Sequence, residues 1–105
     1  MSSIISAQLD EISALAADLA ALADELGGDA QLCRSAAAPL RAALGGSEGW
    51  RAGTVAVAWS SLVDVVAGRT GEAAGALVAA VAAYRAADAA IADRVCAVPG
   101  ARTPR

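Results

Sequence analysis

The sequence contains no histidine, no lysine and no phenylalanine, and only two of its 105 residues are cysteine. Without histidine it lacks the commonest general base and metal ligand of proteins. Two cysteines alone do not form a zinc site, and no glycine-rich phosphate loop is present. All eight basic residues are arginine and are outnumbered by eleven acids, so the chain is poorly suited to neutralising nucleic-acid phosphates. We therefore expect a protein that is not an enzyme, needs no metal or cofactor, and binds no nucleic acid.

Long hydrophobic runs are also scarce. The longest, from Ala73 to Tyr84, spans about a dozen residues, fewer than the roughly 18 that a membrane span requires. Residues 1–5 carry neither a basic segment nor a long apolar one, so we expect no ordinary signal peptide. The sequence thus predicts no stable membrane span.

What the sequence has in abundance is alanine, with 31 residues, against ten leucines, nine valines and four isoleucines. Alanine is the strongest helix former, and leucine, arginine and glutamate follow it closely, so the composition predicts an all-α protein. Because alanine side chains are small, such helices bury little apolar area by themselves. We expect thin helices that pack closely and share their burial with a partner.

The first half of the chain predicts one long helix from about Ser6 to Leu44. Larger apolar residues recur every three or four positions, which is typical of a seam between helices packed at a shallow angle; they are Ile12, Leu15, Leu19, Leu22, Leu26, Cys33, Ala37, Leu40 and Leu44. Gly27 and Gly28 leave open the alternative of a break, with Asp29 capping a new helix. Pro39 adds strain to the same arm.

Three glycines within residues 45–49 mark the strongest break, so we expect a bend over residues 45–50 and a second arm over about 52–96. The second arm has its own seam, in which Trp59 is expected to lie in the core, at Val55, Trp59, Leu62, Val66, Ala73, Leu77, Val81, Tyr84, Ile91 and Val95. Residues 1–98 are therefore predicted as one antiparallel helical hairpin that pairs into a four-helix bundle dimer. Residues 99–105 are predicted to be disordered.

Charge is distributed unevenly along the chain. Residues 1–30 contain six acids and no arginine, so the remainder carries a net positive charge. Such an acidic arm is either a solvated helix face or a surface that selects a basic partner and disfavours a copy of itself.

Cys33 and Cys96 distinguish two architectures. In a straight hairpin they lie roughly 45–50 Å apart at about 1.5 Å per residue, too far for a disulfide, which needs Cα atoms within about 7 Å. They come within reach only if the arms fold back at Gly27-Gly28 and Gly68 into a compact bundle. Otherwise both remain unpaired thiols.

Two motifs resemble those of a known family. Trp50-Arg51-Ala52-Gly53 stands at the predicted bend, and Tyr84-Arg85-Ala86-Ala87-Asp88 stands near the end of the second arm. Over residues 6–95 the chain resembles the helical-hairpin proteins of actinobacterial type VII (ESX) secretion, which form the WXG-motif superfamily, and most closely its EspC-like branch. The family's bend motif corresponds to Trp50 and Gly53, with the glycine one position later than in strict Trp-x-Gly. Its Tyr-x-x-x-Asp/Glu export signal corresponds to Tyr84 and Asp88.

The resemblance implies a non-enzymatic secretion substrate or helper that leaves the cytoplasm without a signal peptide. Its implied partners are a second helical hairpin, in a homodimer or heterodimer, and the secretion machinery. Each motif also has a plainer interpretation, in which Trp50 covers the bend and Tyr84 packs in the seam. Two alternative functions fit the same residues, namely a cytoplasmic helical interaction or regulatory module and the helical leader domain of a secreted toxin.

Overall fold

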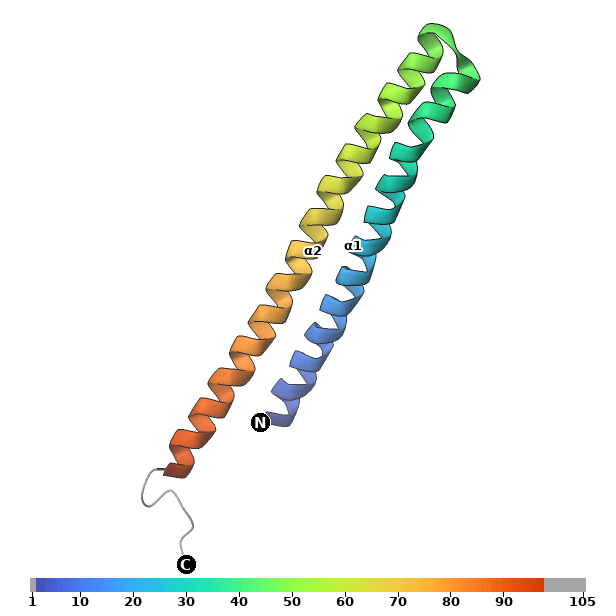
Figure 1. Ribbon diagram of the computed structural model, residues 1–105. Coiled ribbons are helices and arrows are strands. Elements are labelled where there is room, and N and C mark those ends of the chain that lie inside the picture. Colours follow the sequence, from blue (N-terminus) through green and yellow to red (C-terminus); the bar gives the residue numbers. More distant parts are fainter. Residues whose placement is uncertain (1, 98–105) are drawn as a thin grey trace, which may run out of the picture.

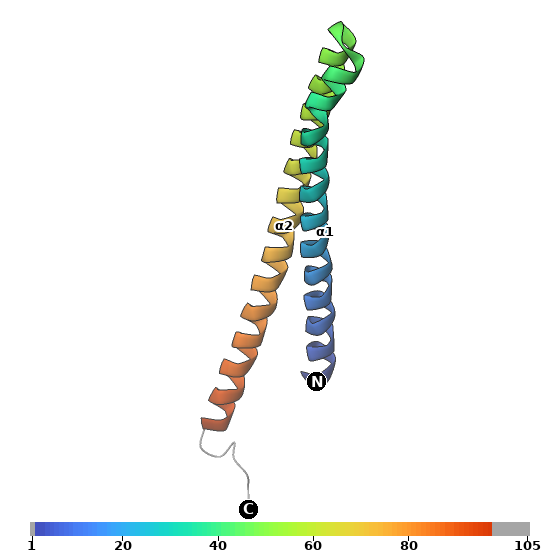
Figure 2. The same cartoon turned by 45° about the vertical axis from the view of Figure 1, so that its right-hand side comes forward.

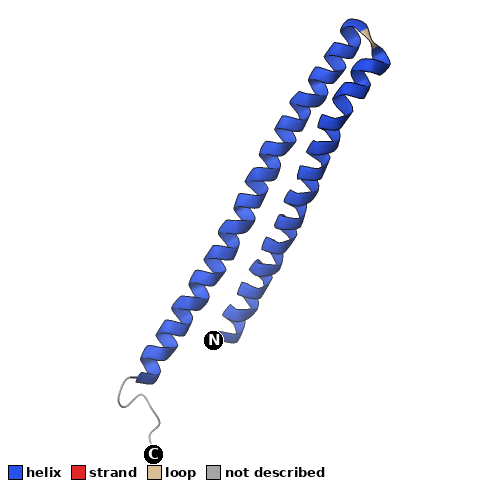
Figure 3. Ribbon diagram, in the orientation of Figure 1, coloured by secondary structure: helices blue, strands red, loops and turns tan. Residues whose placement is uncertain are grey.

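Two long helices joined by a single glycine make up the part of the chain that the structure describes (Figure 1). The structure is a computed structural model that describes residues 2–97. Helix α1 spans Ser2–Leu44 and helix α2 spans Gly46–Ala97, and the two lie antiparallel. No strand occurs in this range (Figure 3), so the prediction of an all-α helical hairpin is confirmed. The tail predicted as disordered, residues 99–105, lies outside the described residues.

The hairpin is extended along its whole length. Its radius of gyration is 24.3 Å and its longest dimension is 88 Å. A compact domain of this length has a radius of gyration of about 13 Å. The alternative of arms folded back into a four-helix unit is therefore wrong, since both helices run straight past the glycines at which such a fold would turn.

Helix α1 continues through Gly27, Gly28 and Pro39, as the prediction of one long first helix requires, and it begins at Ser2 rather than Ser6. Proline in a helix interior costs about 3 kcal/mol relative to alanine, and each glycine costs about 1 kcal/mol. No neighbouring atom lies within 4 Å of a Cβ built on either glycine. Packing against α2 must therefore offset these costs.

The bend is shorter than predicted, because Gly45 alone separates the helices instead of residues 45–50. Gly45 and Gly46 have φ angles of 65° and 55°, in the left-handed region that costs other residues about 1–2 kcal/mol. The amide of Gly45 donates to the carbonyl of Arg41 at 2.9 Å, and the amide of Gly49 donates to the carbonyl of Gly45 at 2.8 Å. Trp50 consequently lies within α2.

Small residues that recur every seven positions form the seam between the helices. A seven-residue repeat keeps two supercoiled helices in continuous contact, and small side chains let their axes approach toward the lower end of the usual range of about 8–10 Å. The buried seam residues are Leu9, Ala16, Ala30 and Ala37 on α1 and Gly53, Ser60, Ala74 and Val81 on α2.

Of the predicted seam residues, Ala37 and Val81 are buried and Leu19, Leu26, Cys33 and Leu77 are half-buried, but the prediction is wrong for the others, which are exposed. Leu15 and Leu22 remain 51% and 44% exposed, and Trp59, expected in the core, is 57% exposed. A spacing of three and four residues identifies a stripe along a helix, but the adjacent stripe about 60° around the helix has the same spacing. The helices pack through the adjacent stripe of smaller residues, which leaves the larger ones outside.

Close packing near the bend depends on Gly49 and Gly53, which both face Arg41. A Cβ built on Gly49 would lie 2.6 Å from the carbonyl oxygen of Arg41, and one on Gly53 would lie 2.6 Å from the Cγ of the same residue. The first contact is with backbone and the second with a flexible side chain. Gly49 is therefore the position where the two backbones need glycine.

We expect Gly49→Ala to lower the free energy of unfolding by about 1–3 kcal/mol, because the added methyl group forces the helices apart at the bend. Gly28→Ala is the matched control, since this helical glycine is exposed and has open space around its Cβ position. It should raise the free energy of unfolding by about 0.5–1 kcal/mol. Denaturant unfolding followed by circular dichroism measures both, and a neutral Gly49→Ala would contradict the close approach.

Candidate interaction surface

The hairpin has two broad sides that differ in polarity. With 3.6 residues per turn, positions one and four after a seam residue lie on one side of a helix, and positions three and six after it lie on the other. Both ion pairs of the described chain, Arg34–Asp64 and Asp10–Arg85, use positions of the first kind. We call this the polar side and the opposite one the apolar face.

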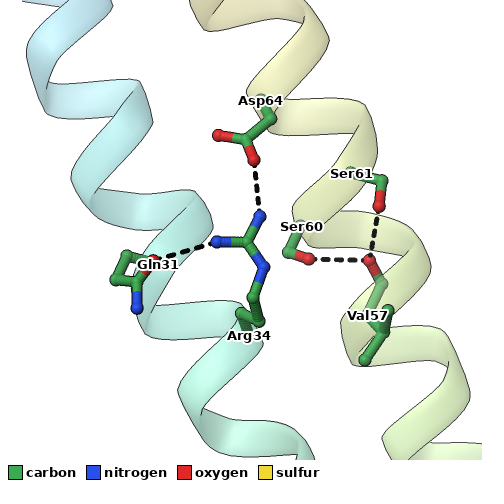
Figure 4. A network of polar contacts seen from close by, with 6 residues as sticks. All are labelled: Gln31, Arg34, Val57, Ser60, Ser61 and Asp64. Atoms are coloured by element: carbon green, nitrogen blue, oxygen red, sulfur yellow. Dashed lines mark hydrogen bonds and ion pairs between the residues drawn. The ribbon is translucent and has the colours of Figure 1, made fainter.

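Figure 4 shows the polar side where Arg34 crosses the seam. Its guanidinium donates to Asp64 at 2.5 Å and to the side chain of Gln31 at 2.9 Å. Beside it the fully buried Ser60 donates its hydroxyl to the carbonyl of Val57 at 2.7 Å, which satisfies the one polar side chain in the seam. Because Arg34 and Asp64 are half exposed, their pair contributes only about 0–1 kcal/mol. It mainly fixes how the helices align.

The apolar face gathers most of the larger side chains that the sequence placed in the seams. Its larger members lie three and six positions after the seam residues and are exposed or half-buried; they are Ile12, Leu15, Leu19, Leu22, Leu26, Cys33 and Leu40 on α1 and Trp59, Val63, Val66, Leu77 and Tyr84 on α2. The same positions also hold the small residues Ala36, Ala52, Ala56, Ala73 and Ala80 and the polar residues Asp29 and Thr70. Near the bend, a groove lined by Leu40 of α1 and Val55, Ala56 and Trp59 of α2 shows that both helices contribute to the same side. A face of this extent on a two-helix protein is typical of an interaction surface.

The two tryptophans lie on opposite sides of the hairpin. Trp59 belongs to the apolar face, whereas Trp50 lies three positions before Gly53, toward the polar side, and is 63% exposed. The interpretation of Trp50 as a ring that covers the bend is therefore wrong, because its ring faces solvent. Of the predicted bend motif, Gly53 is buried against Arg41 and Trp50 remains available to another molecule.

Tyr84 and Asp88 lie one turn apart on α2, both exposed, so the interpretation of Tyr84 as a packed seam residue is wrong. Figure 2 shows the two helices separating toward the termini, and every residue from 82 to 97 is exposed. In the described chain no hydrogen bond or ion pair engages either side chain, whereas Arg85 between them is held by Asp10. The structure thus presents the ring and the carboxylate together.

Cys33 and Cys96 are not joined by a disulfide in the described chain. Cys33 lies half-buried in the half of α1 nearer the bend, and Cys96 lies one residue before the end of α2. In an antiparallel hairpin this places them tens of ångströms apart at 1.5 Å per residue. The disulfide considered from the sequence is therefore absent.

We expect mass analysis of the non-reduced protein to find no bond between Cys33 and Cys96, because the helices hold the two residues far beyond the roughly 7 Å limit for Cα atoms. Cys33→Ser and Cys96→Ser are the matched variants that assign any thiol adduct to one position. An intramolecular Cys33–Cys96 peptide in the native protein would contradict the extended hairpin.

Neither a metal centre nor a relative points to a different kind of site. Within residues 2–97 no three side chains of the ligand types His, Cys, Asp and Glu come together. In the same range, α2 is long and apolar enough by composition to cross a membrane. Core helices of water-soluble proteins meet the same criterion of length and hydropathy. The absence of a membrane span therefore stays a prediction. No family model matches the chain, and neither a curated protein nor a solved structure is detectably similar to it.

The apolar face consists largely of residues that the hydrophobic periodicity predicts in the seam. A signal for it exists in the seven-residue repeats of small residues, with alanine at 16, 23, 30 and 37 in the first arm. In the second arm, residues 53, 60, 67 and 74 are Gly, Ser, Ala and Ala. Because small residues at one heptad position allow close helix contact, this repeat predicts the true seam and leaves the larger stripe for a partner.

Proposed function

We propose that this protein is a non-enzymatic substrate or helper of type VII secretion, exported through a signal formed by Tyr84 and Asp88. The observation that carries the proposal is the exposure of both side chains, one turn apart, on the part of α2 where the helices separate. Residues four apart share a helix face, so a receptor could contact the aromatic ring and the carboxylate at once. The resemblance in the Trp50 and Tyr84 motifs supplies the class of receptor.

The apolar face supplies the second part of the proposal, which is pairing with another helical hairpin. Only six apolar residues are buried in the described hairpin, and four of them are alanine. Nineteen larger apolar side chains remain exposed in the described hairpin, and seven of them lie on the apolar face, namely Ile12, Leu15, Leu22, Leu40, Trp59, Val66 and Tyr84. Burying such surface is favourable by about 25 cal/mol per Å², so a partner that covers the face stabilises the hairpin. The proposed role therefore rests on pairing and recognition, with no chemistry of its own.

The same face also fits a helical interaction module that is never exported, and this is the second candidate function. The two candidates agree on partner binding and differ only in whether Tyr84 and Asp88 direct secretion. Export from the native host decides between them.

We expect Asp88→Ala to reduce secretion to near background while the protein still accumulates in cells. Asp88 is exposed and makes no hydrogen bond or ion pair in the described chain, so its removal should change the free energy of unfolding by no more than about 0.5 kcal/mol. The measurement is the ratio of protein in culture filtrate to protein in lysate, with helicity checked by circular dichroism.

Asp93→Ala is the matched control, because Asp93 is another exposed acid on the same helix, outside the motif. It should be secreted at the wild-type level. A folded Asp88→Ala variant that reaches the filtrate like the wild type would refute the signal. Wild-type protein that never leaves the cell would make the interaction module the better account.

A further inference from the structure

Contacts between the two helices fix the register of the hairpin. We call two residues level when they lie at the same height along its long axis. Contacts across the seam place Asp10 level with Arg85, Ala23 with Gly71, and Arg41 with Gly53. The same alignment extends to the apolar face. It determines which side chain of α1 stands beside which side chain of α2.

At three levels of this face, a large side chain on one helix stands beside an alanine on the other. Leu15 is level with Ala80 and Leu22 with Ala73, so at these two levels the large residue belongs to α1. Leu19 of α1 and Leu77 of α2 lie between them. Nearer the bend Trp59 of α2 is level with Ala36 of α1, and the order is reversed. Neither helix is uniformly bulky along the face.

We infer that the occupant of this face is a second copy of the same chain, packed with its bend at the same end. A two-fold axis along the hairpin places α1 of each copy against α2 of the other, at the same level. Leu15 and Leu22 then face Ala80 and Ala73 of the second copy, and Trp59 faces Ala36. At these three levels a large side chain meets a small one, which favours close packing, and between the first two Leu19 faces Leu77 of the second copy.

Charge favours the same arrangement. Glu11, Asp18 and Glu25 lie along the outer edge of α1 beside the apolar face, and residues 1–30 contain no arginine. With the bends at opposite ends, α1 would lie against α1, so the acidic edges of the two copies would repel each other. With the bends at the same end, Glu25 comes level with Arg69 of the other copy. Neither of these two residues has an ion-pair partner within the described hairpin.

This inference builds on the proposed function, since it names the partner of the apolar face, but it is tested on purified protein without secretion machinery. Failure of export and failure of pairing are therefore separate results. Sedimentation of the wild type should give a dimer at micromolar concentration. A wild-type monomer, or a monomer that binds instead to phosphatidylglycerol vesicles, would overturn the inference.

Val66→Asp and its neighbour Val65→Asp form a matched pair. Val66 lies on the apolar face and is 45% exposed, whereas Val65 is 56% exposed and lies outside that face. Burying an unpaired carboxylate in the interface should weaken the dimer of Val66→Asp by about 100-fold or more, while Val65→Asp stays dimeric. Equal effects of the two variants would refute the assigned face.

A second pair of variants keeps the test decisive if Val66→Asp fails to fold. Both Glu25 and Arg69 are exposed, so reversing their charges leaves the hairpin intact. Glu25→Arg should weaken the dimer several-fold, and the double variant Glu25→Arg with Arg69→Glu should restore it. A double variant no tighter than the single one would contradict the pairing of α1 with α2 of the second copy.

Cys33 tests the orientation directly. It lies on the apolar face, and with the bends at the same end the two Cys33 side chains occupy the same level. A short bis-maleimide should therefore cross-link two copies of the Cys96→Ser variant. With the bends at opposite ends and the helices centred on each other, the two thiols would lie about 30 Å apart at 1.5 Å per residue. A dimer that does not cross-link would overturn the same-end arrangement.

Discussion

The close contact of small residues along the seam is the interaction on which the rest of the structure depends. Alanine, glycine and serine at seven-residue intervals let two long helices approach closely. At Gly49 the approach is close enough that an added Cβ would lie 2.6 Å from the carbonyl oxygen of Arg41. This contact must offset the proline and the glycines inside α1. It also decides which side chains remain outside.

The larger apolar residues are outside because the small ones are inside. A helix of this diameter can face its neighbour with only one stripe, and a stripe about 60° away is left to solvent or to another molecule. Here that stripe carries isoleucine and leucine on α1 and valine, leucine and tryptophan on α2, and the two stripes lie on the same side of the hairpin. The fold thus separates the residues that hold the helices together from those that can bind a partner.

The two ends of the hairpin differ in how closely the helices pack. Near the bend the helices pack closely. Gly45 is the only residue between them, and the positive φ angles of Gly45 and Gly46 reverse the chain there. Toward the termini the helices separate, and Tyr84 and Asp88 stand exposed on α2. Another molecule can therefore contact these two side chains without disturbing the seam that maintains the hairpin.

Much of this fold follows from the sequence, but the packed face does not. Alanine content, the glycines at 45–49 and the helical periodicity predict an all-α hairpin with a central bend, and long helices tolerate Gly27 and Gly28 once they are packed. Leucine and tryptophan give a stronger hydrophobic signal than alanine, so the periodicity predicts the wrong stripe as the seam. It predicts Trp59 in the core, although the helices meet through Ser60. The exposure of Tyr84 could not be predicted either, since it depends on where the helices separate.

The unfolding free energy of Ala30→Leu tests the small-residue seam most directly. Ala30 is fully buried between the helices, and Ala17, exposed on the same helix, is the control position. If the seam requires small residues, Ala30→Leu should lose about 1–3 kcal/mol from overpacking, while Ala17→Leu stays near neutral. A seam built like an ordinary leucine-rich coiled coil would instead gain stability from the added side chain. A more stable Ala30→Leu protein would therefore contradict the account.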